Sequence, residues 1–218
     1  MRIRTILAAA AAPAALAAVL LGTAGQASAA TVNQPNPNSV IVVHDQAGLD
    51  ALGGTINKNV DIAADAQPAA GKDTLWLQGT TINGNLTVEG QLMMTGDTIN
   101  GNVTESGPGS FLGLTNYASH ITGNLTVTGS SGVYQGGPGG RAFGNWTQYN
   151  GPSQVDGGFT FTNNTGSLYV AYPMHVSGKF TASGNGPYAR ADMPQWTWDT
   201  SGLTVDGKTS VVPPTYSS

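Results

Sequence analysis

The chain has 218 residues, a formal net charge of −4, only 9% charged residues and no cysteine. This charge excludes a basic surface for nucleic acid and disfavours binding to an anionic membrane. Without cysteine no disulfide can form, so packing and hydrogen bonds must hold the fold together. One domain of ordinary size with a sizeable core is expected.

Residues 1–29 have the three parts of a secretory signal. Arg2 and Arg4 form the charged start, residues 6–21 the apolar middle, and residues 27–29 (Ala-Ser-Ala) the cleavage motif. We therefore expect a secreted, extracellular bacterial protein that is cleaved near Ala29 and keeps no membrane anchor. Cleavage removes both arginines and leaves 6 basic against 12 acidic residues.

Residues 30–38 are polar, contain two prolines and predict an extended, flexible N-terminal arm. Such an arm is either an unstructured terminus or a peptide that inserts into a groove on a partner protein. The residues proposed for that contact are Thr31, Val32, Asn33, Gln34 and Pro35.

A strand is expected over residues 39–43, followed by a short helix over residues 46–52. Asp45 is a suitable N-cap for this helix, and Gly53 a suitable stop. An amphipathic helix at this position would cap the open N-terminal end of a repetitive β-structure.

A seven-residue phrase then recurs along the chain, with the frame apolar, any, Gly, any, apolar, Thr, apolar. The interval between copies is close to 20 residues, which is typical of stacked repeats. The apolar residues fall at even offsets and therefore share one face of a strand. Copies begin at Ile82, Ile99, Ile121, Ala142, Val155 and Val176, with weaker echoes at Ile56 and Val205.

This repeat predicts an all-β fold, a single-domain parallel β-solenoid over residues 39–212 with loops at 61–72 and 129–141. A β-sandwich built from hairpins is the alternative. Stacking in register would align polar side chains in two rows. Within each row, the residues of successive layers would be about 4.8 Å apart. These rows are Thr87, Thr104, Thr126, Thr147, Thr160 and Thr181, and Asn85, Asn102, Asn124 and Asn145.

The single threonine row is flat and uncharged, as are the faces of ice-binding solenoids. Those faces usually carry two aligned threonine columns, whereas this repeat predicts only one. Ice binding is therefore not the leading interpretation of the row.

The C-terminal region after residue 182 is aromatic and irregular, and it ends in a loose tail at 213–218. Trp196 and Trp198 alternate and would share a face, and Tyr188 precedes them. The three rings either seal the C-terminal end of the stack or form a platform for sugar rings.

Candidate catalytic and metal-binding groups are scattered. The three histidines, His44, His120 and His175, have no ligand spacing, and His120 and His175 are expected about three layers apart on the surface. Glu89 and Glu105 end equivalent strands and are the one carboxylate pair that neighbouring layers would bring together, although a solvated turn explains Glu105 equally well. No catalytic residue, metal site or cofactor is assigned.

The phrase Gly84-Asn85-Leu86-Thr87-Val88 resembles the repeats of bactofilins and of filamentous-haemagglutinin-type adhesins. The resemblance covers roughly residues 55–182 and implies a β-solenoid, but it carries over no functional residue. A signal peptide departs from the cytoskeletal bactofilins, and the chain length departs from the giant adhesins.

We therefore expect a secreted, non-enzymatic structural or adaptor protein that binds another extracellular protein. Two alternatives remain open. The first is a carbohydrate- or cell-wall-binding module that uses Trp196 and Trp198, and the second is a degenerate polysaccharide-degrading enzyme that uses Glu89 or Glu105.

Overall fold

A computed structural model describes residues 39–114, 118–130, 134–136, 152–170, 173–186, 198–212 and 214. The predicted signal, the N-terminal arm with residues Thr31, Val32, Asn33, Gln34 and Pro35, Tyr188 and Trp196 lie outside these residues. Within them the protein is all-β except for one short helix, α1 (Gln46–Asp50).

The strands form three sheets, which from β2 onward each take every third strand of the chain, and β1 is added at one edge of the eight-stranded sheet. The eight-stranded sheet consists of β1 (Val40–Asp45), β3 (Asn59–Gln67), β6 (Leu86–Val88), β9 (Val103–Ser106), β12 (Leu125–Thr128), β15 (Phe159–Thr162), β18 (Phe180–Ser183) and β21 (Thr209–Val211). The seven-stranded sheet consists of β2 (Thr55–Ile56), β5 (Thr81–Ile82), β8 (Thr98–Ile99), β11 (His120–Ile121), β14 (Ser153–Val155), β17 (Met174–Val176) and β20 (Leu203–Val205). The six-stranded sheet consists of β4 (Leu75–Gln78), β7 (Gln91–Thr95), β10 (Phe111–Leu114), β13 (Tyr134–Gly136), β16 (Leu168–Val170) and β19 (Trp198–Asp199).

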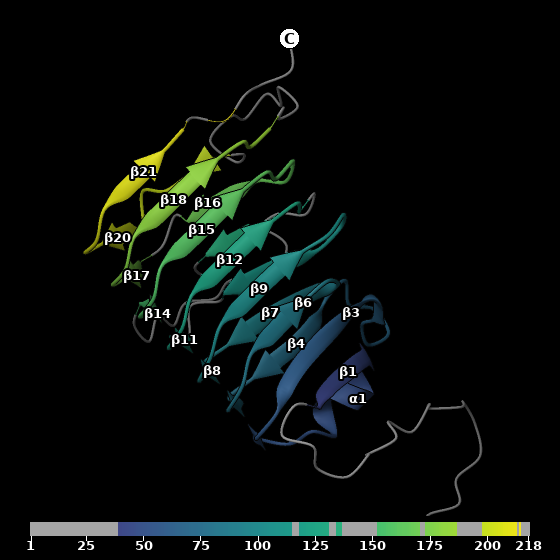
Figure 1. Ribbon diagram of the computed structural model, residues 1–218. Coiled ribbons are helices and arrows are strands. Elements are labelled where there is room, and N and C mark those ends of the chain that lie inside the picture. The colour runs from purple at the N-terminus through teal and green to yellow at the C-terminus, as the bar shows by residue number, and fades with distance from the viewer. Residues whose placement is uncertain are drawn as a thin grey trace, which may run out of the picture.

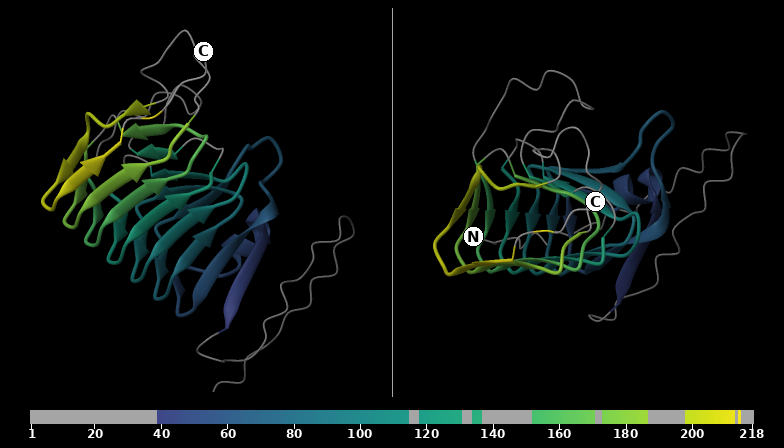
Figure 2. Two further views of the ribbon diagram at one scale, coloured as in Figure 1. Left: turned by 45° about the horizontal axis from the view of Figure 1, so that its top comes forward. Right: turned by 90° about the horizontal axis from the view of Figure 1, so that it is seen from above.

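Every strand pairing in the described residues is parallel. For example, β9 pairs with β6 on one side and with β12 on the other. Three successive strands, one in each sheet, therefore form a layer, and Figures 1 and 2 show the layers following one another along the molecule. A sandwich built from hairpins requires antiparallel pairs, which the described residues do not contain.

The apolar residues of the repeat face inward, as their even spacing predicts. Ile82, Ile99 and Ile121 are aligned in register on the seven-stranded sheet, and all three are fully buried. Val60, Leu86, Val103 and Leu125 form an equivalent buried row on the eight-stranded sheet. Each layer therefore buries its apolar side chains against the layers before and after it.

Glycine recurs in the repeat because the backbones of adjacent layers approach closely at this turn. A Cβ added at Gly123 would lie 2.5 Å from the carbonyl oxygen of Gly101, and one at Gly178 would lie 2.5 Å from that of Gly157. No side chain fits at such a distance. Lys58, which replaces glycine in the first echo of the repeat, lies at the end of this row and has no earlier copy beneath it.

The predicted asparagine row is confirmed as a ladder over three of its four members. The side-chain oxygen of each asparagine accepts from the backbone N–H of the equivalent residue in the next layer. This holds from Asn85 to Asn102 (2.9 Å) and from Asn102 to Asn124 (2.9 Å), and Asn59 extends the ladder backward to Asn85 (2.8 Å). These bonds satisfy turn amides that face solvent.

No layer lies between the copies that begin at Ile121 and Val155, so the prediction that the Ala142 copy stacks between them is wrong. β12 pairs directly with β15, with Thr126 opposite Thr160, and Gly158 takes the place expected for Asn145 by donating its backbone N–H to the Asn124 side-chain oxygen. Asn145 and Thr147 lie outside the described residues. Both weak echoes are layers instead, because Ile56 pairs with Ile82 and Val205 with Val176.

The loop predicted over residues 61–72 is also wrong for most of its length. β3 continues to Gln67, and β1 pairs with it up to Val43 opposite Ile62 and again, after a break in register, at Asp45 opposite Gln67. Strand pairing here overrides a local composition that is rich in alanine and aspartate.

The helix prediction is confirmed, although α1 ends two residues earlier than expected. Asp45 caps it by accepting from the Gly48 backbone N–H at 2.6 Å, and Leu49 is buried. The Gln46 side chain bonds both the backbone N–H and the carbonyl of Trp76 in β4. α1 thus connects β1 of the eight-stranded sheet with β4 of the six-stranded sheet at the N-terminal end of the stack. None of the described helices is long and apolar enough to span a membrane.

Candidate functional site

A row of histidine and aspartate side chains lies on the outer face of the seven-stranded sheet. β11, β14, β17 and β20 are consecutive strands there, and His120, Gln154, His175 and Thr204 are aligned in register on them. The residue two positions after each histidine or glutamine points to the same face. We define the His–Asp row as His120, Gln154, Asp156, His175 and Asp206.

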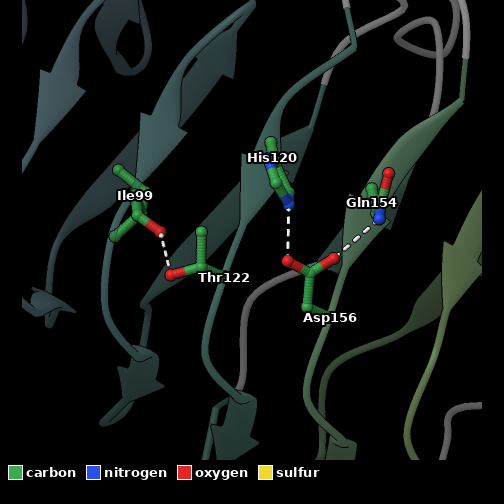
Figure 3. Close-up of polar contacts among 5 residues, drawn as sticks. All are labelled: Ile99, His120, Thr122, Gln154 and Asp156. Atoms are coloured by element: carbon green, nitrogen blue, oxygen red, sulfur yellow. Dashed lines mark hydrogen bonds and ion pairs between the residues drawn. The ribbon is translucent and has the colours of Figure 1, made fainter.

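Each histidine of the row bonds an aspartate of the next strand. The His120 Nε2 atom lies 2.8 Å from Asp156 Oδ2, and Gln154 Nε2 donates to Asp156 Oδ1 at 2.6 Å (Figure 3). Two layers further on, His175 Nε2 lies 2.9 Å from Asp206 Oδ2. The same diagonal contact therefore occurs twice.

The Asp156 carboxylate stays ionised because of these neighbours. The hydrogen bond from His120 lowers the pKa of Asp156, with further lowering by Gln154 and by the charges of His120 and His175. Asp156 and His120 are each 39% exposed, so the pair is open to a partner. The row thus offers hydrogen-bonding and charged groups at fixed spacing.

The side-chain partners of the two histidines are carboxylates and not nucleophiles, within the ranges that the structure describes. The hydroxyl group of Thr122, which Figure 3 also draws, donates to the carbonyl of Ile99 at 3.4 Å. Neither histidine bonds a serine or threonine hydroxyl within the described part of the chain. A histidine acts as a general base on a nucleophile when the two side chains are within hydrogen-bonding distance.

The sequence interpretation placed these histidines on the surface but missed their partners. It counted a layer at residues 142–148, so His120 and His175 were expected three layers apart, whereas only β14 separates their strands. The missed signal is positional. Histidine precedes the first apolar residue of one copy, and aspartate holds the second position of the next copy that forms a layer.

Glu105 is buried, and the expectation of a solvated turn or of a pair with Glu89 is wrong. It is aligned with Val88 and Val127, which face the core, so its side chain also faces inward and is 0% exposed. Its Oε1 atom accepts from Ser110 at 3.1 Å and from Ser130 at 2.8 Å. Glu89 is exposed, so the two carboxylates do not meet.

Burial strongly affects the ionisation of two carboxyl groups. Desolvation raises the pKa of Glu105 to about 7, against the lowering effect of the two serine bonds. It raises the pKa of Asp97 to about 6, although the backbone N–H groups of Thr80 and Thr95 bond that carboxylate at 2.8 and 2.6 Å. Sequence reasoning did not find Asp97, which lies in a corner just before β8, outside the repeated phrase.

Trp198 is the only member of the predicted sugar platform within the described residues. It pairs with the buried Leu168, and its ring contacts Phe161 edge-on, with centroids 6.0 Å apart. Trp198 is half-buried at the C-terminal end of the core. This contact favours the sealing role over an open sugar platform.

No group of three or more histidine, cysteine, aspartate or glutamate side chains that could hold a metal ion occurs in the described ranges. No family model, no curated protein and no solved structure matches the chain.

Proposed function

We propose that the chain is a secreted, non-enzymatic β-solenoid that binds another extracellular protein. The parallel, in-register pairing of all three sheets supports the solenoid, since each strand's neighbours come from the layers before and after it. The N-terminal signal pattern of residues 1–29 supports secretion.

The observation that carries the binding role is the His–Asp row. Its side chains are held by bonds of 2.6 to 2.9 Å and come from adjacent strands of one sheet. Preorganised side chains lose little conformational entropy when a partner binds, which favours affinity. The predicted arm, residues Thr31–Pro35, would add contacts of its own.

The chemistry of the row defines the partner class. Charged and polar groups at an interface contribute mainly to specificity and to the rate of association. The His–Asp row therefore suits a polar protein surface with hydrogen-bond donors and acceptors at matching spacing.

Affinity capture from culture supernatant tests this proposal. The tagged mature chain serves as bait, and three variants are compared: deletion of residues 31–38, Asp156→Asn with Asp206→Asn, and Thr81→Ala as a control on the same sheet. We expect the unmodified bait and the Thr81→Ala control to capture the same protein, and the Asp156→Asn, Asp206→Asn variant to lose it. Equal capture by all baits would contradict a role for the row, and loss only on deletion would assign binding to the arm.

A further inference from the structure

The outer face of the eight-stranded sheet carries two columns of hydroxyl groups, where sequence analysis expected one. The second column arises at the residue just after the seven-residue phrase, which the repeat frame does not include. The first column is Thr87, Thr104, Thr126, Thr160, Thr181 and Ser210, and the second is Ser106, Thr128, Thr162 and Ser183. We call these ten residues the hydroxyl face.

The two columns are aligned across four consecutive strands. Thr126 and Thr128 of β12 lie opposite Thr160 and Thr162 of β15, and the same register continues to β9 and β18. Figure 1 shows these strands side by side and pointing in one direction. Neighbouring strands are about 4.8 Å apart, and alternate residues along a strand about 6.7 Å apart. The hydroxyl groups therefore lie on a two-dimensional grid.

The grid is neutral, and no other part of the described chain occupies its hydroxyl groups. None of the ten side-chain hydroxyl groups takes part in a hydrogen bond within the residues that the structure describes. All ten are partly or fully exposed. No charged side chain interrupts either column, and the nearest carboxylates in register, Asp61 and Glu89, lie at the N-terminal border.

The seven threonine side chains of the hydroxyl face are also rigid. Threonine is β-branched and has restricted rotation about its first side-chain bond. Its backbone is fixed here by parallel ladders on both sides, and the residues between the two columns, such as Val127 and Phe161, are buried in the core. The positions of hydroxyl and methyl groups are thus set before any ligand arrives.

A rigid neutral grid of this kind fits a ligand that is itself periodic. Ice is such a ligand, because its water molecules occupy fixed lattice sites with repeats of comparable size, whereas those of liquid water do not. A crystalline polysaccharide is the competing periodic ligand, but sugar rings are bound mainly by stacking on aromatic side chains. The hydroxyl face contains none.

We propose that the hydroxyl face binds the surface of ice. Methyl groups order the adjacent water, and the hydroxyl groups bond to water molecules at lattice positions. This activity is separate from the proposed protein binding, because it uses a different sheet from the His–Asp row.

The test measures adsorption to ice directly. The mature chain is partitioned between a growing ice hemisphere and the liquid, and the gap between melting and freezing points is measured in small droplets. We expect the wild-type chain to enter the ice and to open such a gap. The proposal is overturned if the protein is excluded from the ice and the melting and freezing points do not separate.

Two variants locate the activity. Thr126→Tyr with Thr160→Tyr places bulky rings on adjacent strands at the centre of the grid, and tyrosine suits a strand position. Thr81→Tyr with Thr98→Tyr is the matched control, an adjacent pair on the outer face of the seven-stranded sheet. We expect loss of ice binding in the first pair only, with circular dichroism showing that both remain folded.

A milder pair keeps the test decisive if the tyrosine variant unfolds. Thr126→Val with Thr160→Val retains shape and methyl groups and removes two hydroxyl groups, and we expect a reduced freezing gap. Unchanged binding in folded face variants contradicts the proposal. Binding to microcrystalline cellulose or chitin with exclusion from ice would assign the face to a polysaccharide instead.

Discussion

Glu105 shows how one buried carboxyl group makes the stability of this protein depend on pH. Its pKa is about 7 in the folded chain and 4.5 when unfolded. Between these values the folded state holds a proton that the unfolded state has lost. The free energy of unfolding therefore decreases as pH rises from about 4.5 to about 7, and the contribution is constant outside this range.

Glu105→Gln should remove this dependence, because glutamine still accepts hydrogen bonds from the serines and carries no charge. We expect the variant to be more stable than the wild type above pH 7 by about 3 kcal/mol, since each pKa unit corresponds to about 1.4 kcal/mol. Urea unfolding between pH 4.5 and 8 measures the difference. Glu89→Gln is the exposed control, and an equal gain there would contradict the burial of Glu105.

Leu125 and Thr126 are neighbours on opposite faces of β12, and they separate the contribution of the core from that of the surface. Leu125 is 0% exposed, so Leu125→Ala should lower the free energy of unfolding by about 2–5 kcal/mol. Thr126 is partly exposed, so Thr126→Ala should change it by less than about 1 kcal/mol. Similar losses of unfolding free energy for the two variants in denaturant titrations would contradict the placement of Leu125 in the core and Thr126 on the surface.

At the scale of the element, the turn glycines determine how closely the layers approach. A Cβ at Gly123 would meet the Gly101 carbonyl oxygen at 2.5 Å and the Asn102 side-chain oxygen at 2.7 Å, and neither is free to move away. Gly123→Ala should therefore destabilise the protein by about 1–3 kcal/mol, as overpacking does. Gly54→Ala is the matched control, since nothing lies within 4 Å of that Cβ. Thermal unfolding of the two variants compares them, and an unaffected Gly123→Ala would be evidence against this close contact.

The strands of the repeat were predictable because their signal is local. Apolar residues at even offsets identify the inward face, and a glycine at a fixed position identifies the turn, as at Ile121, Gly123 and Leu125. This local signal does not determine which copies pair with one another, because pairing also depends on which strand occupies the neighbouring layer. The phrase at 142–148 fits the frame, yet β12 pairs with β15.

The candidate sites were less predictable for the same reason. The His120–Asp156 contact joins residues 36 apart in sequence, and the second hydroxyl column depends on strands that end one residue beyond the repeated phrase. Both features are visible only once the register between layers is known. The burial of Glu105 was missed because its position was judged by charge, whereas its even offset from Val103 already placed it on the inward face.

At the scale of the whole molecule, the fold and both candidate surfaces depend on layers that stack in parallel with a fixed register. Thr126 and Thr160 are 34 residues apart in sequence and directly opposite one another on adjacent strands. Adjacent strands are about 4.8 Å apart, within the range of Cα separations that a disulfide bridges. The natural chain has no cysteine, so an introduced pair has no competing partner.

The most direct test is therefore oxidation of the Thr126→Cys, Thr160→Cys double variant, followed by peptide mapping under non-reducing conditions. The described stacking predicts an intramolecular disulfide between these positions, and none in a Thr98→Cys, Thr160→Cys control whose members belong to different sheets. Failure of the first pair to close, together with closure of a Thr126→Cys, Thr147→Cys pair, would contradict the register from which the fold, the His–Asp row and the hydroxyl face are all derived.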